Sequence, residues 1–222
     1  MKILLAPSES KTIFCDHKII NQNNFVFPEL FEKRLSVIRE FKNEFDEQIF
    51  DKQTTKAFLR YDGVAFEAID YKNLEKDTQN YLDKNVLIFS NIFGPILGGD
   101  FVPNYKFPQG TKLTNINIEK HYKQYFSAQI DTFAGDFVVD LRAGFYDKFY
   151  EPTIKSFGFK FYKGGKIVSH WAKFYRGIIA KEMAKHNILS ESELLNLQID
   201  KLHVKNLIVS KNKTILEMNI GE

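Results

Sequence analysis

A chain of 222 residues can form one large domain or two small ones, and 44% hydrophobic and 15% aromatic residues can supply a substantial core. The formal net charge of +3 is too small to indicate nucleic-acid binding by itself, although a local basic patch is compatible with it. A single cysteine, Cys15, excludes an intramolecular disulfide framework and fits a reducing compartment, and no run approaches the roughly 20 apolar residues of a membrane span.

The first half of the chain is predicted to begin with a strand and to continue with helices. The apolar run at 3–6 is shorter than the roughly 7–15 apolar residues of a secretory signal, so we interpret residues 2–6 as a buried strand. It ends in a polar loop, 7–12, which carries hydroxyls, a carboxylate and an ammonium group. Pro28 suits the first turn of a helix, and apolar residues recur at helical spacing from there to about residue 45. Further helices are predicted at 54–59, 65–69 and 74–82.

The second half of the chain alternates short apolar strands with helices and ends in β-structure. Its strongest local signal is a β-hairpin formed by 157–162 and 166–171, because two glycines in the turn accept positive φ at no steric cost. The hairpin leads directly into a cationic helix, in which apolar residues recur at helical spacing through Met183. The other predicted elements are strands at 86–89, 137–141, 207–210 and 214–218, an extended segment at 101–107, and helices at 118–133 and 191–197.

The order of these elements predicts a single α/β (mixed α+β) domain over residues 1–222, with a mixed sheet and surrounding helices, because both hairpins and helical crossovers are present. Three of the apolar strands end in loops that are rich in polar residues or glycine: 7–12, 90–100 and 140–144. If these strands are parallel neighbours, their loops converge on one edge of the sheet, where α/β proteins commonly bind ligands.

Residue type alone leaves the chemistry of these loops open. Asp100 and Asp140 are suited to acid–base work as a carboxylate pair, and equally to the capping of turns. Ser8 with Lys11 permits a hydroxyl activated by an amine, although anion binding or helix N-capping is the commoner use of such residues. The glycine-rich segment 90–100 lacks the lysine and hydroxyl of a phosphate-binding P-loop.

The cationic helix has a stripe of small residues on one side. Basic residues flank this stripe, whose members are Gly177, Ala180 and Ala184, and the aromatic and aliphatic residues Trp171, Tyr175, Ile178 and Ile179 fall on the opposite side. A small-residue stripe lets another backbone approach closely, and that backbone is either a second helix or a phosphate chain. Lys173 and Arg176 lie in the first turn, where free backbone N–H groups also favour an anion.

Four segments of the chain match, in order, the sequence blocks of a known family. They are Pro7-Ser8-Glu9-Ser10-Lys11; Ser90-Asn91-Ile92-Phe93-Gly94 with Asp100 and Tyr105-Lys106; Asp140-Leu141-Arg142-Ala143-Gly144-Phe145-Tyr146; and Ser169-His170-Trp171-Ala172-Lys173-Phe174-Tyr175-Arg176-Gly177. Together they resemble the YaaA family, also called UPF0246 or DUF328. The resemblance implies a bacterial cytoplasmic protein of the peroxide-stress response, with a positively charged cleft and a helix-hairpin-helix-like element in one compact α/β unit.

The resemblance also implies DNA binding, to duplex or branched forms, without sequence preference. On this hypothesis the DNA- and anion-binding residues are Lys11, Arg142, Lys173, Arg176, Gly177, Lys181 and Lys185. The alternative is an enzyme that acts on a small anionic or nucleotide-like ligand in a cleft formed from Ser8, Glu9, Ser10, Ser90, Gly94, Asp100, Tyr105, Lys106, Asp140, Ser169 and His170. A third possibility is an interaction protein with neither activity. We expect no metal and no other cofactor, because histidines and cysteine are scattered along the chain, and no membrane association.

Overall fold

Three short apolar strands form the centre of the structure, a computed structural model that describes residues 1–17 and 19–221 except for the side chain of His170. β1 (Lys2–Leu5) lies between β3 (Val86–Ser90) and β6 (Phe137–Asp140) and pairs in parallel with both. Parallel strands need cover on both faces, which explains why these three strands are short, almost continuous apolar runs. All five residues of β3 are buried, as are the last three residues of β1.

The sheet extends from this centre in both directions to eight strands. β4 (Gly94–Leu97) pairs antiparallel with β3 and forms one edge. Beyond β6 the order is β7 (Lys155–Lys163), β10 (Lys213–Ile220) and β9 (Leu202–Ser210), and β8 (Lys166–Ile167) pairs with the end of β7. β7 runs parallel to β6 and β10, whereas β9 is antiparallel to β10. The mixed sheet within one compact unit confirms the predicted α/β fold class.

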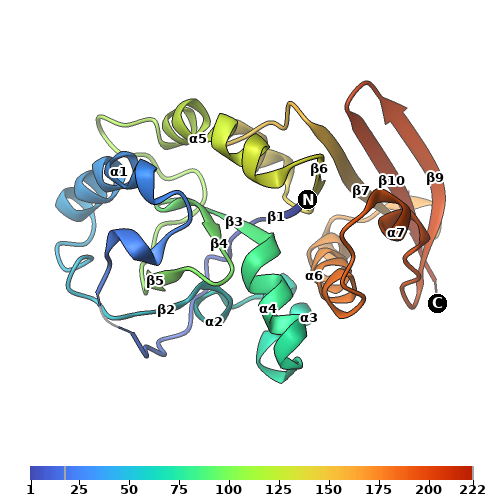
Figure 1. The fold of residues 1–222 in the computed structure, drawn as a ribbon, viewed down its shortest axis with the longest axis horizontal. Helices are drawn as coiled ribbons and strands as arrows, with labels where there is room; N and C mark the ends of the chain where they lie inside the picture. Colours follow the sequence, from blue (N-terminus) through green and yellow to red (C-terminus); the bar gives the residue numbers. More distant parts are fainter. Residues whose placement is uncertain (18, 222) are drawn as a thin grey trace.

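Helices cover both faces of the central strands. In Figure 1, α1 (Phe31–Glu44) and α5 (Ile118–Ala134) lie on one side of β1 and β3, and α3, α4 and α6 lie on the other. The remaining elements are α2 (Ala57–Arg60), α3 (Val64–Ile69), α4 (Lys76–Asn85), α6 (His170–Lys185), α7 (Glu191–Asn196), β2 (Thr54–Lys56), β5 (Phe101–Pro103) and the 3-10 helices η1 (Gln22–Asn24), η2 (Pro28–Leu30), η3 (Tyr71–Asn73) and η4 (Gly144–Lys148). The best counterpart of a helix-hairpin-helix-like element is α2 and α3, two short helices joined by residues 61–63. Within the described residues, no helix combines the length and the apolar character needed to cross a membrane.

The predicted helix at 54–59 is wrong in its first half. Residues 54–56 form β2, which pairs antiparallel with β5 in a separate two-stranded sheet. Thr54 and Thr55 are fully buried, and β-branched side chains pack better on a pleated strand than in a helix. The helix α2 therefore begins only at Ala57.

The glycine-rich segment 90–100 is a tightly packed hairpin and not the open loop that its composition predicts. β4 folds back antiparallel on β3 within this segment. Gly94 has a φ of +66°, and a Cβ atom there would lie 2.3 Å from the ring of Tyr122. A Cβ atom at Gly98 would lie 2.1 Å from the ring of Phe58. These glycines are explained by close packing against aromatic rings, without any bound phosphate.

The predicted β-hairpin at 157–171 is present, but its second strand is shorter than expected. β8 ends at Ile167, and α6 begins at residue 170, so Trp171 belongs to the helix. Trp171 is also 45% exposed, although the helical pattern placed it on an apolar face. The middle of α6 is buried on two sides, because Ile179 packs in the core together with Ala180 and Ala184 from the small-residue stripe.

Candidate functional site

A pocket of about 330 Å³ lies at the carboxyl ends of the three central strands. Residues 6–10 follow β1, Asn91 follows β3, and Leu141 and Ala143 follow β6, and all of them line the pocket. The predicted convergence of the strand-end loops is therefore found. From β1 the chain crosses to β3 on one side, and from β6 it continues to β7 on the other, so the pocket lies at a topological switch point, where open α/β sheets bind ligands.

Helix α6 supplies the positive charge of the pocket. Lys173 and Arg176, one turn apart, both line it. Arg176 is half-buried, and it forms no hydrogen bond or ion pair with any residue that the structure describes. Burial lowers the pKa of the Arg176 guanidinium, and the Asp140 carboxylate partly offsets this effect. A cation that is withdrawn from water without a partner gains stability from an anion that enters the pocket.

The loop after β1 is fixed against the turn between α2 and α3. The Ser8 hydroxyl donates a hydrogen bond to the carbonyl oxygen of Asp62, and the Asp62 N–H donates to the Ser10 carbonyl at 3.0 Å. The Thr12 N–H donates to the Arg60 carbonyl at 2.8 Å. Because the turn continues directly into α3, these bonds hold the two walls of the pocket in a defined arrangement.

Lys11 stabilises this loop through hydrogen bonds to its backbone and does not line the pocket. Its Nζ donates to the carbonyls of Ser8 and Glu9, both at 3.2 Å, and lies 4.1 Å from the centre of the Tyr105 ring. Burial lowers the pKa of Lys11 to about 8, although the Glu9 carboxylate acts in the opposite direction. The hydroxyl of Tyr105 in turn bonds to those of Ser90, at 2.7 Å, and Tyr61, at 2.8 Å. Lys11, Ser90 and Tyr105 therefore support the loop and lie outside the pocket lining.

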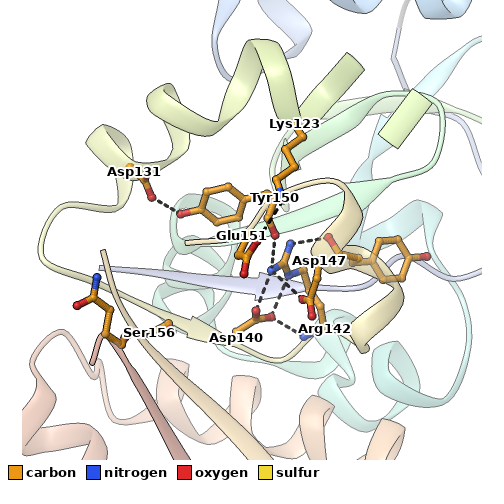
Figure 2. Close-up of polar contacts among 10 residues, drawn as sticks. Lys123, Asp131, Asp140, Arg142, Asp147, Tyr150, Glu151 and Ser156 are labelled. Carbon is orange, nitrogen blue, oxygen red and sulfur yellow. Dashed lines mark hydrogen bonds and ion pairs between the residues drawn. The ribbon is translucent and has the colours of Figure 1, made fainter. Parts of the chain in front are cut away.

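Arg142 also directs its donors at the protein (Figure 2). Its side chain is fully buried and donates to both carboxylate oxygens of Asp140, at 2.9 and 2.8 Å, and to the carbonyls of Tyr146 and Tyr150, each at 3.1 Å. The guanidinium carbon lies 4.4 Å from the centre of the Phe89 ring. Arg142, predicted to bind phosphate, instead anchors η4, from which Tyr146 reaches the pocket.

Asp140 and Asp100 belong to separate hydrogen-bonded groups and do not form the carboxylate pair that their residue type permits. Burial would raise the pKa of Asp140, but the charge and hydrogen bonds of Arg142 outweigh it, and the net shift is downward. Asp100 accepts the backbone N–H groups of Val26 at 2.9 Å and Leu97 at 2.8 Å. Burial raises the pKa of Asp100 to about 6. Both aspartates therefore fit the capping interpretation.

The contacts of Gly177 show which backbone packs against the small-residue stripe of α6. A Cβ atom at this position would lie 2.2 Å from the carbonyl oxygen of Ala65 in α3. The backbone that approaches α6 closely is therefore a second helix and not a phosphate chain.

The remaining candidates lie away from the pocket. Lys185 forms an ion pair with Glu182 at 2.8 Å. Its position on α6 is about 13 Å from that of Arg176 along the helix axis. Lys181 also lies outside the lining, as do the exposed residues Lys106 and Ser169 and the buried Gly94. The side chain of His170 is outside the described part of the structure.

Several lining residues were missed by the sequence prediction. They are Leu5, Ala6, Pro7, Gly63, Val64, Ala65, Phe66, Asn91, Gln109, Leu141, Ala143 and Tyr146. Gly63 lies in a predicted turn, and Asn91 and Tyr146 lie within the matched sequence blocks, so a signal existed for these three. No sequence pattern indicates the contribution of α3 and Gln109, because only packing of distant segments brings them to the strand ends.

The fold and the pocket define a mixed α/β protein with a pocket at the switch point of its sheet, lined on one side by two basic residues of α6. A family model described as "Peroxide stress protein YaaA" matches residues 26–207. An uncharacterized protein of Campylobacter jejuni is 40% identical, covering 98% of this chain and 99% of that protein. A UPF0246 protein of Albidiferax ferrireducens is 30% identical over 64% and 61% of the two chains, and one of Corynebacterium glutamicum is 28% identical over 89% of each. The chain therefore belongs to the YaaA (UPF0246) family of peroxide stress proteins, as the four sequence blocks predicted.

Proposed function

We propose that this peroxide stress protein binds a small anionic ligand in the pocket, with Arg176 and Lys173 as the charged contacts. The observation that carries the proposal is the half-buried Arg176, which lines the pocket and forms no hydrogen bond or ion pair with the described residues. Ligand cavities range from about 300 to 1,000 Å³, so a pocket at the lower end of that range suits a metabolite. We also propose a cytoplasmic location, because a single cysteine fits a reducing compartment.

If the protein also transforms this ligand, Glu9 is our candidate for the general acid or base. Glu9 is exposed and lines the pocket, whereas Asp100 and Asp140 are committed to protein hydrogen bonds. The hydroxyl of Ser10 lies in the same loop. Glu9 and Ser10 are suited to acid–base work on a bound anion, and the alternative enzyme hypothesis rests on these two residues.

The anion proposal is tested by calorimetric titration of inorganic phosphate into the wild type and two single variants, Arg176→Gln and Lys173→Gln. A hydrogen bond to a charged group is worth about 1.5–3 kcal/mol, so Arg176→Gln should weaken binding roughly 10- to 100-fold. Lys181→Gln removes the same charge from the same helix outside the pocket, and it should change the affinity less than about twofold, since exposed charges contribute little at a distance. Phosphate binding that is equally strong in Arg176→Gln would contradict the proposal.

A second candidate function, binding of the DNA backbone, is favoured by the tip of the β7–β8 hairpin. Lys163 and Lys166 lie directly opposite each other across the strand pair, an arrangement that costs stability because like charges repel. The Lys163 ammonium lies 5.4 Å from the centre of the exposed Trp171 ring. Lysines beside an exposed aromatic ring are typical of nucleic-acid surfaces. Lys173 follows on α6. Lys11, Arg142 and Gly177 all contact other parts of the protein, so the hairpin tip is a better candidate for the DNA surface than those three residues.

The DNA candidate is tested by measuring duplex and junction affinity across a salt series. Each phosphate contact contributes about −0.9 to the slope of log affinity against log salt, so Lys163→Gln with Lys166→Gln should reduce the slope by about 1.8. Lys112→Gln with Lys120→Gln removes the same charge elsewhere and should leave the slope unchanged. Affinity that does not depend on salt would exclude this function.

A further inference from the structure

Opposite charges share the pocket without pairing. Glu9 lines it from the loop after β1, and Lys173 and Arg176 line it from α6. Within the described part of the chain, Glu9 forms no ion pair with either cation, and its carboxylate accepts the Gln109 backbone N–H at 3.2 Å. A ligand that carries only negative charge would be attracted by α6 and repelled by Glu9. The pocket therefore suits a ligand with an anionic group at one end and hydrogen-bond donors elsewhere.

The rest of the lining combines apolar residues with residues that carry amide groups. Phe66 and Tyr146 are its aromatic members, and they are 7% and 3% exposed. The Asn91 side chain is oriented by two bonds, because its Nδ2 donates to the Phe107 carbonyl at 3.2 Å and its Oδ1 accepts from the Tyr146 hydroxyl at 3.4 Å. Among the described residues, no group accepts from the second N–H of that amide or bonds to the side chain of Gln109, so both are available to a ligand. Aromatic faces stack on nucleobases, and asparagine and glutamine amides recognise base edges.

From this combination we infer that the ligand is a nucleoside monophosphate, an inference that rests on the proposed anion site. The phosphate contacts Arg176 and Lys173, the ribose hydroxyls donate to Glu9, and the base lies against the aromatic part of the lining. The position of the pocket agrees with a nucleotide ligand, because open α/β sheets commonly bind nucleotides at their switch point.

The test compares ligands by calorimetry with the wild-type chain. The probes are the four ribonucleoside 5′-monophosphates, ribose 5-phosphate and inorganic phosphate. At least one nucleotide should bind about tenfold or more tightly than ribose 5-phosphate, because stacking of the base adds to affinity. This comparison changes only the ligand, so it does not depend on whether a variant folds.

A Glu9→Gln variant gives a second result whose sign is diagnostic. The glutamine carbonyl can still accept the Gln109 N–H, so the loop is expected to keep its conformation. Loss of the carboxylate should weaken nucleotide binding by about tenfold, because it removes a charged acceptor of ribose hydroxyls, but should strengthen binding of inorganic phosphate. Glu67→Gln, an exposed glutamate of α3 outside the lining, is the matched control and should change neither affinity.

The outcomes separate this inference from the proposal beneath it. If phosphate and ribose 5-phosphate bind as tightly as every nucleotide, or if Glu9→Gln strengthens nucleotide binding as well, the nucleotide assignment is wrong and the anion site stands. If neither phosphate nor any nucleotide binds, or if binding ignores Arg176→Gln, the proposed anion site is wrong and the nucleotide assignment falls with it.

Discussion

The basic side chains of this protein differ in which groups accept hydrogen bonds from them. Arg176 lines the pocket and forms no hydrogen bond or ion pair with the described residues, whereas the Arg142 guanidinium is enclosed by Asp140, two carbonyls and the Phe89 ring. The family resemblance predicts the same anion-binding role for both arginines, and the two side chains differ in how deeply they are buried. Removal of Arg176 is therefore expected to change binding, and removal of Arg142 is expected to change stability.

Arg142→Gln should destabilise the fold by about 3–5 kcal/mol, because it leaves the largely buried Asp140 carboxylate without its partner. The free energy of unfolding in urea measures this effect. Lys123→Gln is the control, since it breaks an exposed pair with Glu151 that is worth about 0–1 kcal/mol. If the two variants lose the same stability, the Asp140–Arg142 pair does not support the pocket as described.

Asp100 gives a pH-dependent prediction. Its folded-state pKa is raised to about 6 by burial, above the ordinary value of 3.8, so the folded state binds more protons between these two pH values. Stability contributed by the neutral carboxyl is therefore lost as pH rises from about 4 to 6, by at most about 3 kcal/mol.

Asp100→Asn removes this titration and keeps an oxygen for the Val26 and Leu97 N–H groups. Urea unfolding at pH 4 and pH 7 should show the variant gaining stability relative to the wild type at the higher pH. A stability difference that is independent of pH would show that Asp100 does not titrate in this range.

At the level of elements, α6 both packs the fold and forms the pocket. Its small-residue side lies against α3 at Gly177, while Lys173 and Arg176 reach the pocket from neighbouring turns. The position of the two cations therefore depends on how closely the two helices pack.

Gly177→Ala should destabilise the protein by about 1–3 kcal/mol, because the new methyl group would overlap the Ala65 carbonyl oxygen. The gain in helix propensity from alanine, about 1 kcal/mol, is too small to offset a backbone clash of this kind. The midpoint of urea unfolding measures the change, with Lys181→Ala as a control on the same helix. A Gly177→Ala variant more stable than the wild type would mean that the glycine is not required by the α3–α6 contact.

The elements that the sequence predicts well are those with a strong periodic pattern. The runs at 2–6, 86–89 and 137–141 are short and apolar, which is typical of buried parallel strands, and all three pair as expected. β2 is missed because three residues carry too little periodicity to separate a strand from a helix. The segment 90–100 was predicted as an open loop because glycines that allow close packing resemble the glycines of a loop.

The candidate site is predicted only in part for a related reason. The apolar runs predicted that the loops 7–12, 90–100 and 140–144 converge if their strands are parallel neighbours, and the structure shows those strands as parallel neighbours. Burial could not be predicted, so the sequence left Asp100 open between acid–base work and capping and placed Arg142 among the anion-binding candidates, whereas both side chains form hydrogen bonds within the protein. The contribution of Phe66 and Gln109 depends on contacts between segments far apart in the chain, which no single-sequence pattern contains.

The whole molecule brings four distant segments of the chain together at one end of its sheet. Residues 6–10, Asn91, residues 141–146 and the start of α6 meet there because β1 pairs with both β3 and β6 and the β7–β8 hairpin leads into α6. The result is a pocket whose cationic wall is carried by a packed helix. The central claim is that this wall, through Arg176, binds an anion.

A crystal structure of the protein with tungstate tests this claim most directly, because tungstate imitates phosphate and its heavy atom identifies the site unambiguously. We expect tungstate within hydrogen-bond distance of the Arg176 guanidinium, in the pocket at the ends of β1, β3 and β6, and its loss in crystals of Arg176→Gln. Tungstate bound at other lysines, with this pocket empty, would contradict this claim.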